Sequence, residues 1–91
     1  MAYQIIILPS AEKDFDKISP PIRDLVVKRL MWLAENGDEV IHHALKGMPE
    51  DLSGLCRFRV GDYRILYWKY PSHKLLKIYR VLHRSTVYKG L

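Results

Sequence analysis

Near the N-terminus a continuous apolar run is followed by apolar residues at helical spacing. Residues 3–8 are rich in Ile and are stopped by Pro9, which predicts a short strand. Ser10 has the side chain of a helix N-cap, and Glu12 lies in the first turn, where the helix dipole favours an acid. The short helix that follows is expected to bury one face, made of Ala11, Phe15 and Ile18.

A longer apolar stripe predicts a second helix. Ser19 is the expected N-cap with Pro20 at the first helical position, and Asn36-Gly37 supplies a stop. The stripe consists of Ile22, Leu25, Val26, Leu30 and Leu33, with charged residues on the other side. The two helices are expected to be antiparallel.

From residue 55 onward the spacing becomes that of strands. Residues 55–60 and 63–70 are β-rich runs joined by Gly61-Asp62, a two-residue hairpin signal of the type that puts Gly first. A turn at residues 71–73 then leads to a further strand over residues 75–82.

These elements predict an α+β fold over a single domain, residues 1–91. An N-terminal strand and two antiparallel helices precede a mainly antiparallel β-meander, which packs against the helices. Residues 38–54, which contain Gly, Pro and several acids, are expected to form an ordered loop between helix and meander, held by Leu45 and Leu52.

The hairpin register predicts a basic face. A two-residue turn pairs Val60 with Tyr63 and Arg59 with Arg64. Side chains alternate across a strand, so the apolar face toward the helices holds Cys56, Phe58, Val60, Tyr63, Ile65 and Tyr67. The opposite face holds Arg57, Arg59, Arg64 and Trp68.

Two arginines opposed across a strand pair destabilise the hairpin by up to about 1 kcal/mol. An anion between them removes that cost, and the guanidinium fork matches a phosphate. The alternative is a solvated basic face paired with Glu50, Asp51 or Asp62.

The charge of the whole chain also favours an anionic partner. Lys and Arg number 15 against 10 Asp and Glu, a formal net charge of +5, which suits nucleic acid or an acidic protein. The single Cys56 leaves no internal disulfide and suits the cytoplasm. No stretch predicts a metal site, a cofactor, a signal peptide or a membrane span.

The C-terminal segment adds chemistry to the arginine face. Arg80, His83, Arg84 and Tyr88 follow or end the last strand. Histidine exchanges protons near neutral pH, arginine stabilises developing negative charge, and tyrosine donates or stacks. Together with the arginine face these groups suit acid–base chemistry on a phosphodiester, whereas His83 alone is more often a surface residue.

An ordered set of motifs resembles the RelE/ParE toxin superfamily, most closely its RelE branch, over nearly the whole chain. The motifs are Leu45-Lys46-Gly47-Met48-Pro49, Asp51-Leu52-Ser53-Gly54-Leu55, Arg59-Val60-Gly61-Asp62-Tyr63-Arg64-Ile65-Leu66-Tyr67 and His83-Arg84-Ser85-Thr86-Val87-Tyr88.

The resemblance implies a toxin of a type II toxin–antitoxin system that cleaves mRNA in the ribosomal A site without a metal. Its nucleophile would be the RNA 2′-hydroxyl. Carried over by position, Arg57, Arg64, Arg84 and Tyr88 would be catalytic. Contacts to RNA or phosphate are assigned to Lys46, Arg59 and Trp68.

The chain departs from the family at the general base. Leu55 replaces one expected lysine, and Arg57 stands where another is usual. Arginine is a poor base because its pKa exceeds ~12. His83 is therefore the expected catalytic base, with His43 as a second candidate near the place where the YoeB branch carries a glutamate.

The implied partners are a cognate antitoxin, the 70S ribosome and its mRNA, with no membrane. Two other functions stay open: a ParE-like inhibitor of DNA gyrase without nuclease activity, and a degenerate co-repressor that only binds its antitoxin. The His-Arg-Ser-Thr-Val-Tyr ending favours the nuclease.

Overall fold

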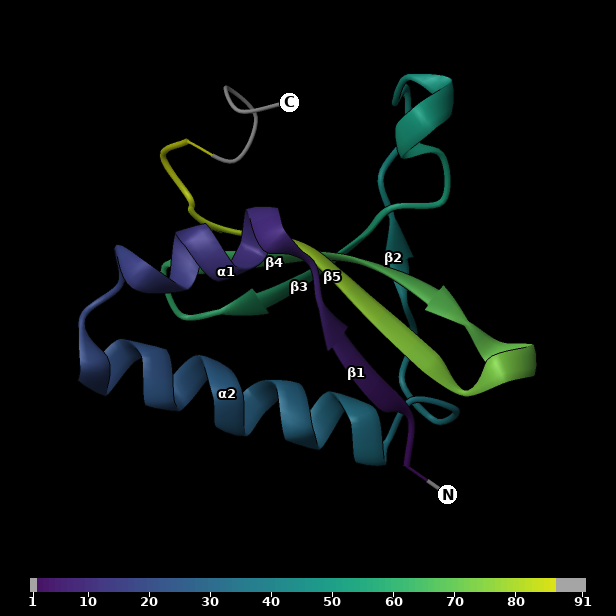
Figure 1. Ribbon diagram of the computed structural model, residues 1–91. Helices are drawn as coiled ribbons and strands as arrows, with labels where there is room; N and C mark the ends of the chain where they lie inside the picture. Colours follow the sequence, from purple (N-terminus) through teal and green to yellow (C-terminus); the bar gives the residue numbers. More distant parts are fainter. Residues whose placement is uncertain (1, 87–91) are drawn as a thin grey trace.

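The computed structural model describes residues 2–86 and contains one five-stranded sheet with two helices (Figure 1). The elements are β1 (Gln4–Ile7), α1 (Pro9–Asp16), α2 (Pro20–Glu35), β2 (His43–Ala44), β3 (Cys56–Val60), β4 (Tyr63–Tyr70) and β5 (Leu75–His83), with 3₁₀ turns at Glu50–Leu52 and Pro71–His73. The strand order is β1-β5-β4-β3-β2. Within residues 2–86 the β1–β5 pair alone is parallel, and the predicted α+β architecture is confirmed.

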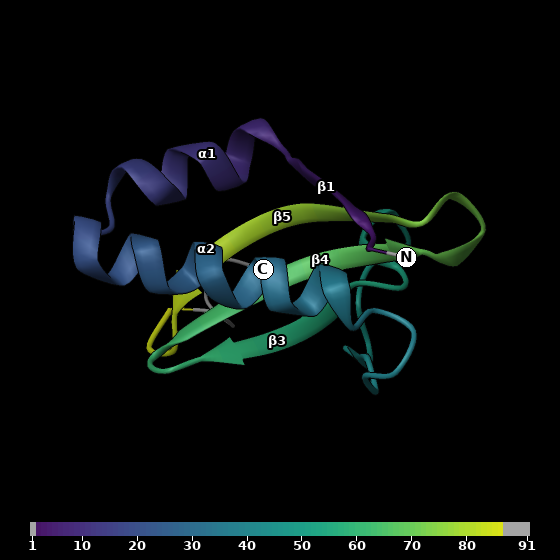
Figure 2. The same ribbon diagram turned by 90° about the horizontal axis from the view of Figure 1, so that it is seen from below.

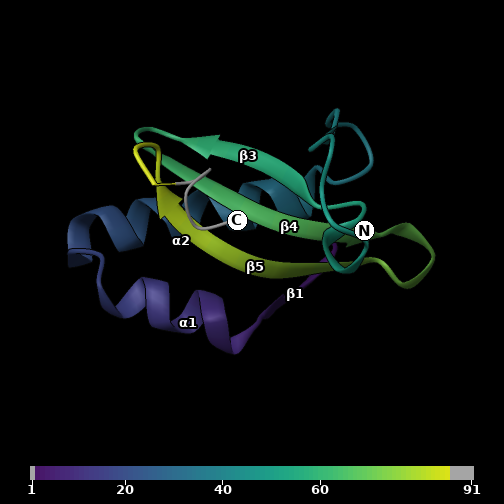
Figure 3. The same ribbon diagram turned by 90° about the horizontal axis from the view of Figure 1, so that it is seen from above.

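Helix α2 lies across one face of the sheet, in front of it in Figure 2 and behind it in Figure 3, and α1 runs beside β5 in both views. The main core lies between these layers, and its completely buried members include Val26, Leu33, Ile65, Leu76 and Ile78. The other side of the sheet is called the helix-free face below.

The hairpin register is confirmed pair by pair. Val60 lies opposite Tyr63, and Arg59 lies opposite Arg64. Gly61 has a φ of +56°, a conformation that suits glycine and allows the two-residue turn. Between β4 and β5 the register shifts beside Leu66, which the sequence did not predict.

A second, smaller apolar cluster lies on the helix-free face. Leu55, Leu66 and Leu82 are its buried members, and Leu45, Met48, Trp68 and Tyr79 pack around them. The chain between β2 and β3 thus folds back onto this face, as the expected anchoring by Leu45 implies. The expectation that residues 38–54 hold no strand was wrong, because His43–Ala44 pairs with β3.

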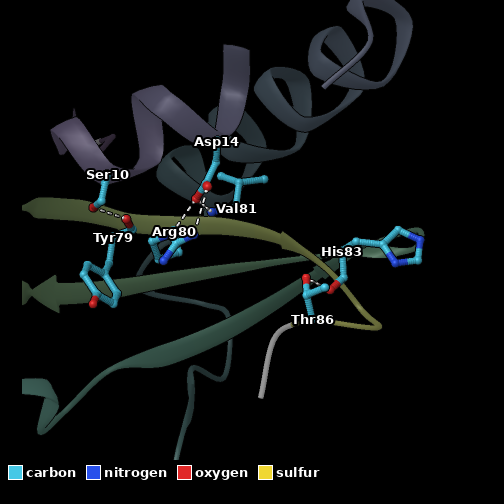
Figure 4. A network of polar contacts seen from close by, with 7 residues as sticks. All are labelled: Ser10, Asp14, Tyr79, Arg80, Val81, His83 and Thr86. Carbon is cyan, nitrogen blue, oxygen red and sulfur yellow. Dashed lines mark hydrogen bonds and ion pairs between the residues drawn. The ribbon is translucent and has the colours of Figure 1, made fainter. Parts of the chain in front are cut away.

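Helix α1 protects an open stretch of β5, as Figure 4 shows. Strand β1 pairs only with Leu75 to Ile78. Beyond it, Ser10 Oγ donates to the Tyr79 carbonyl at 2.6 Å, and a carboxylate oxygen of Asp14 accepts from the Val81 N–H at 2.9 Å. Residues four apart on a helix share a face, so Ser10 and Asp14 together replace the missing neighbour strand.

The predicted role of Ser10 as N-cap was therefore wrong. Helix α1 begins two residues earlier, with Leu8 at the N-cap and Pro9 in the first turn. The Ser10 hydroxyl is used on β5 instead. Helix α2 begins as predicted, with Ser19 at the N-cap position and Pro20 after it, and Asn36 is its C-cap.

Tyr3 joins the N-terminus to the end of α2. Its hydroxyl donates to Asp38 at 2.7 Å, and Lys74 forms an ion pair with the same carboxylate. Gly37 lies under the ring, where an added Cβ would meet a ring carbon at 2.5 Å. This close approach explains why a glycine follows the C-cap.

The buried Tyr3 predicts loss of stability at alkaline pH. Burial, together with the Asp38 carboxylate, raises the pKa of Tyr3 from 10.0 to about 12. Because the folded pKa is the higher one, the contribution is complete below pH 10 and is lost as the pH rises toward 12. Urea unfolding at pH 9, 10 and 11 should show a steeper fall for the wild type than for Tyr3→Phe. Equal slopes would contradict this assignment.

Candidate active site

The helix-free face carries the predicted arginines at its hairpin end. Arg59 and Arg64 are paired across β3 and β4, and Arg57 lies two residues along β3 on the same face. His43 is the cross-strand partner of Arg57. Side chains of directly paired residues are neighbours, so an imidazole and up to three guanidiniums share this end of the face.

The Arg64 side chain is held against the turn. One terminal nitrogen donates to the Gly61 carbonyl at 3.0 Å and to the Tyr63 carbonyl at 3.1 Å. Both bonds use Nη1. Within residues 2–86, Nε and Nη2 are left to bind an anion.

Arg84 lies beside the same turn. Its backbone N–H donates to the Asp62 carbonyl at 2.7 Å, and its Nε is 3.7 Å from an Asp62 carboxylate oxygen. Both side chains are about two-thirds exposed, at 65% and 68%. The ion pair is therefore weak, and a stronger anionic ligand can replace Asp62.

His83 does not join the arginine face. It is paired with Tyr63, whose ring packs on the main core, and the two rings meet edge to face at 5.4 Å. His83 also lines a hollow of about 510 Å³ between α1 and β5, together with Asp14 and Lys17. The prediction that His83 lies with the arginines was therefore wrong. The histidine next to Arg57 is His43.

Arg80 has a structural partner. Its Nε and Nη2 donate to the two carboxylate oxygens of Asp14 at 2.7 and 3.1 Å (Figure 4). The hydrogen bond with Asp14 raises the pKa of Arg80, against the opposing effect of burial. Asp14 is 6% exposed, and it holds α1 onto β5, the strand that ends at His83.

Trp68 lies on the same face as the arginines, two residues along β4 from Leu66, the cross-strand partner of Arg57. Trp68 is half-buried, donates its indole N–H to the Ser53 carbonyl at 3.0 Å and packs on Tyr79 at 5.2 Å between ring centroids. Lys46 is exposed in the loop after β2. Tyr88 lies outside the described residues.

One neighbouring group of residues was missed by the sequence analysis. Trp32 of α2 stacks on Phe58 of β3 at 6.2 Å, and Arg29 lies over both rings. These residues line a hollow of about 290 Å³ with His43 and Arg57 at the edge of β3. The three-residue spacing of Arg29 and Trp32 on the wet side of the helix was the available signal.

Within residues 2–86, no group of three or more His, Cys, Asp or Glu side chains is arranged to hold a metal ion. No helix in that range is long and apolar enough to cross a bilayer.

Solved structures similar to this chain include a RelE toxin and toxin–antitoxin complexes of the RelBE and YoeB–YefM kinds. A chain of the toxin–antitoxin complex RelBE2 from Mycobacterium tuberculosis is 29% identical, with a TM-score of 0.78 over 93% of this chain and 94% of that one. A mutant of the E. coli toxin RelE in the free state has a TM-score of 0.74 at 20% identity, covering 97% and 90%. A chain of the YoeB–YefM complex from Staphylococcus aureus has a TM-score of 0.64 at 20% identity, covering 91% and 98%.

Fold and basic hairpin thus define a RelE/ParE-type protein. The family model described as the ParE toxin of the type II toxin–antitoxin system parDE matches residues 5–88. The chain belongs to this family and is a type II toxin of the RelE/ParE/YoeB type. No match is found among curated proteins.

Proposed function

We propose that this toxin is a metal-independent endoribonuclease that cleaves mRNA in the ribosomal A site. The observation that supports it is the pairing of Arg59 with Arg64 on the helix-free face, with Arg57 on the same side. Opposed cations without an anion are unfavourable in a sheet, and the guanidinium geometry suits a phosphate.

In the proposed reaction the RNA 2′-oxygen attacks the adjacent phosphorus. His43 accepts the proton of the 2′-hydroxyl, because it lies across from Arg57. Arg57, Arg59 and Arg64 bind the phosphate, and Arg84 offsets charge in the pentacoordinate transition state. The bond to the 5′-oxygen breaks, that oxygen receives a proton, and a 2′,3′-cyclic phosphate and a 5′-hydroxyl remain. Tyr88 is proposed to stack on a base.

The second candidate function is inhibition of DNA gyrase through surface contacts. The family model that matches residues 5–88 is described as a ParE toxin, and this description favours gyrase inhibition. In that case the arginines bind an acidic protein surface, and no RNA is cut. A co-repressor that lacks both activities is the third alternative, and it would cause no growth arrest when overproduced.

Primer extension in a translating extract, with and without the protein, tests the nuclease. The expected result is new 5′ ends within codons, which disappear when ribosomes are omitted. A supercoiling assay with gyrase is run on the same preparation. Inhibited supercoiling without new RNA ends would overturn the proposed nuclease in favour of the second candidate.

The two histidines give a further prediction. Removing a general base costs about 10²–10⁴-fold in rate. His43→Ala is therefore expected to lower the cleavage rate at least 100-fold, whereas His83→Ala retains activity within about tenfold, since it lies on the other face. The reverse order of the two rates would show that His83 is the base.

The protein partner is proposed to be a cognate antitoxin. Several solved structures with this fold are complexes of a toxin with its antitoxin. An antitoxin that covers the basic hairpin should carry acidic side chains there, because this end of the sheet is rich in arginine.

A further inference from the structure

A hollow of about 480 Å³ lies on the sheet at the other end of β4 from the arginines. Its walls include Trp68, Tyr70 and Lys77 from β4 and β5, and Asp51 and Ser53 from the loop that precedes β3. The nuclease described above uses none of Tyr70, Lys77 and Asp51.

Aromatic rings and a lysine form one side of this hollow. Trp68 and Lys77 are cross-strand partners and so share the helix-free face, where Tyr70 follows by alternation. Lys77 Nζ lies 5.3 Å from the centre of the Tyr70 ring, which is 37% exposed. The hydrogen bond to Ser53 fixes the plane of the Trp68 indole. Exposed aromatic faces stack on nucleobases, and a lysine beside them neutralises a phosphate.

The loop before β3 adds an acceptor to the hollow. Asp51, one of the lining residues, is an exposed carboxylate. An ionised carboxylate only accepts hydrogen bonds, so it favours a base that presents an amino group over uracil, whose carbonyl oxygens it repels.

The hollow is continuous with the arginine site along β4. Arg64, Leu66, Trp68 and Tyr70 alternate onto one face. Trp68 lies four positions after Arg64, or about 14 Å at ~3.4 Å per strand residue. A single strand whose phosphate lies between the arginines can thus reach the aromatic wall while it follows a face with basic groups at both ends.

We propose that this hollow is a base-binding subsite for single-stranded RNA. It holds a nucleotide that flanks the cleaved position: the base stacks on Tyr70, its amino group donates to Asp51, and Lys77 contacts its phosphate. This inference rests on the proposed nuclease, to which it adds a binding site and a base preference away from the reacting phosphate.

The test is binding of the free protein to labelled six-nucleotide RNAs of A, C or U, followed by fluorescence anisotropy at low salt. A and C strands are expected to bind about fivefold or more tightly than U. Tyr70→Ala should weaken binding to A about tenfold, since stacking is worth ~1–3 kcal/mol per base. Tyr70→Phe should bind like the wild type, and Asp51→Asn should abolish the preference for A and C.

Lys28→Ala is the matched control for Lys77→Ala, because it removes one positive charge from the exposed side of α2. Only Lys77→Ala is expected to weaken binding. Equal losses in the two lysine variants, or unchanged binding by Tyr70→Ala, would overturn the subsite. Because binding is measured without ribosomes or cleavage, such a result leaves the nuclease untouched, and loss of cleavage in arginine variants leaves the subsite untouched.

Discussion

Arg64→Ala is expected to lower the rate of cleavage of ribosome-bound mRNA by about 10²–10³-fold, the usual cost of removing a donor that binds developing negative charge. The orientation of Arg64 is fixed by two bonds from Nη1 to hairpin carbonyls. A fixed donor contributes more to a transition state than a mobile one, because it need not be ordered during the reaction. The rate is measured by primer extension over time in a translating extract.

The fold should survive this change. Both Arg64 bonds go to carbonyls at the exposed hairpin turn, so we expect the free energy of unfolding to change by less than about 1 kcal/mol. Arg64→Lys keeps the charge but loses the fork, and it should recover only part of the rate. Lys28→Ala serves as the control for charge alone. Wild-type cleavage by a folded Arg64→Ala protein would remove Arg64 from the site.

The largest effect on stability is expected for Asp14→Ala. This substitution leaves Arg80 and the Val81 N–H without the carboxylate that binds both. Removing one side of a fully buried ion pair costs about 3–5 kcal/mol, but the Arg80 side chain is 27% exposed and can be partly hydrated, so we expect a loss of about 2–3 kcal/mol. Domains of this size have a total stability of about 5–15 kcal/mol, so the variant should lose a substantial part of its free energy of unfolding. Urea unfolding followed by circular dichroism measures the loss.

Asp16→Ala provides the comparison on the same helix. Asp16 is exposed two residues further along α1, and its replacement by alanine should change the free energy of unfolding by no more than about 0.5 kcal/mol. If Asp14→Ala and Asp16→Ala unfold at the same urea concentration, the contact between α1 and β5 does not depend on the ion pair.

The hairpin was predictable because a single local feature determines it. A two-residue turn with Gly61 first leaves one register, and that register places Arg59 opposite Arg64. The helix-facing side follows from the same alternation. The register and the two faces of the hairpin depend on residues that are close in the sequence, and sequence patterns predict such local structure well.

The errors concern contacts between distant segments. Ser10 has the residue type of a cap, but the open edge of β5 uses its hydroxyl. Arg80 lies close to His83 in sequence, yet Asp14, 66 positions earlier, binds it. The side of the sheet on which His83 lies depends on the register of β5, and the shift beside Leu66 interrupts that register. Strand β2 is too short for any alternation to indicate it.

The central claim is that the arginines of the helix-free face, rather than the overall positive charge, bind the scissile phosphate. Two triple variants test it. One changes Arg57, Arg59 and Arg64 to alanine, and the other changes three exposed lysines of the helical region, Lys13, Lys17 and Lys28, to alanine. Both lose three positive charges. Primer extension on ribosome-bound mRNA should show no cleavage by the arginine variant and near wild-type cleavage by the lysine variant. Equal cleavage by the two folded variants would contradict the claim.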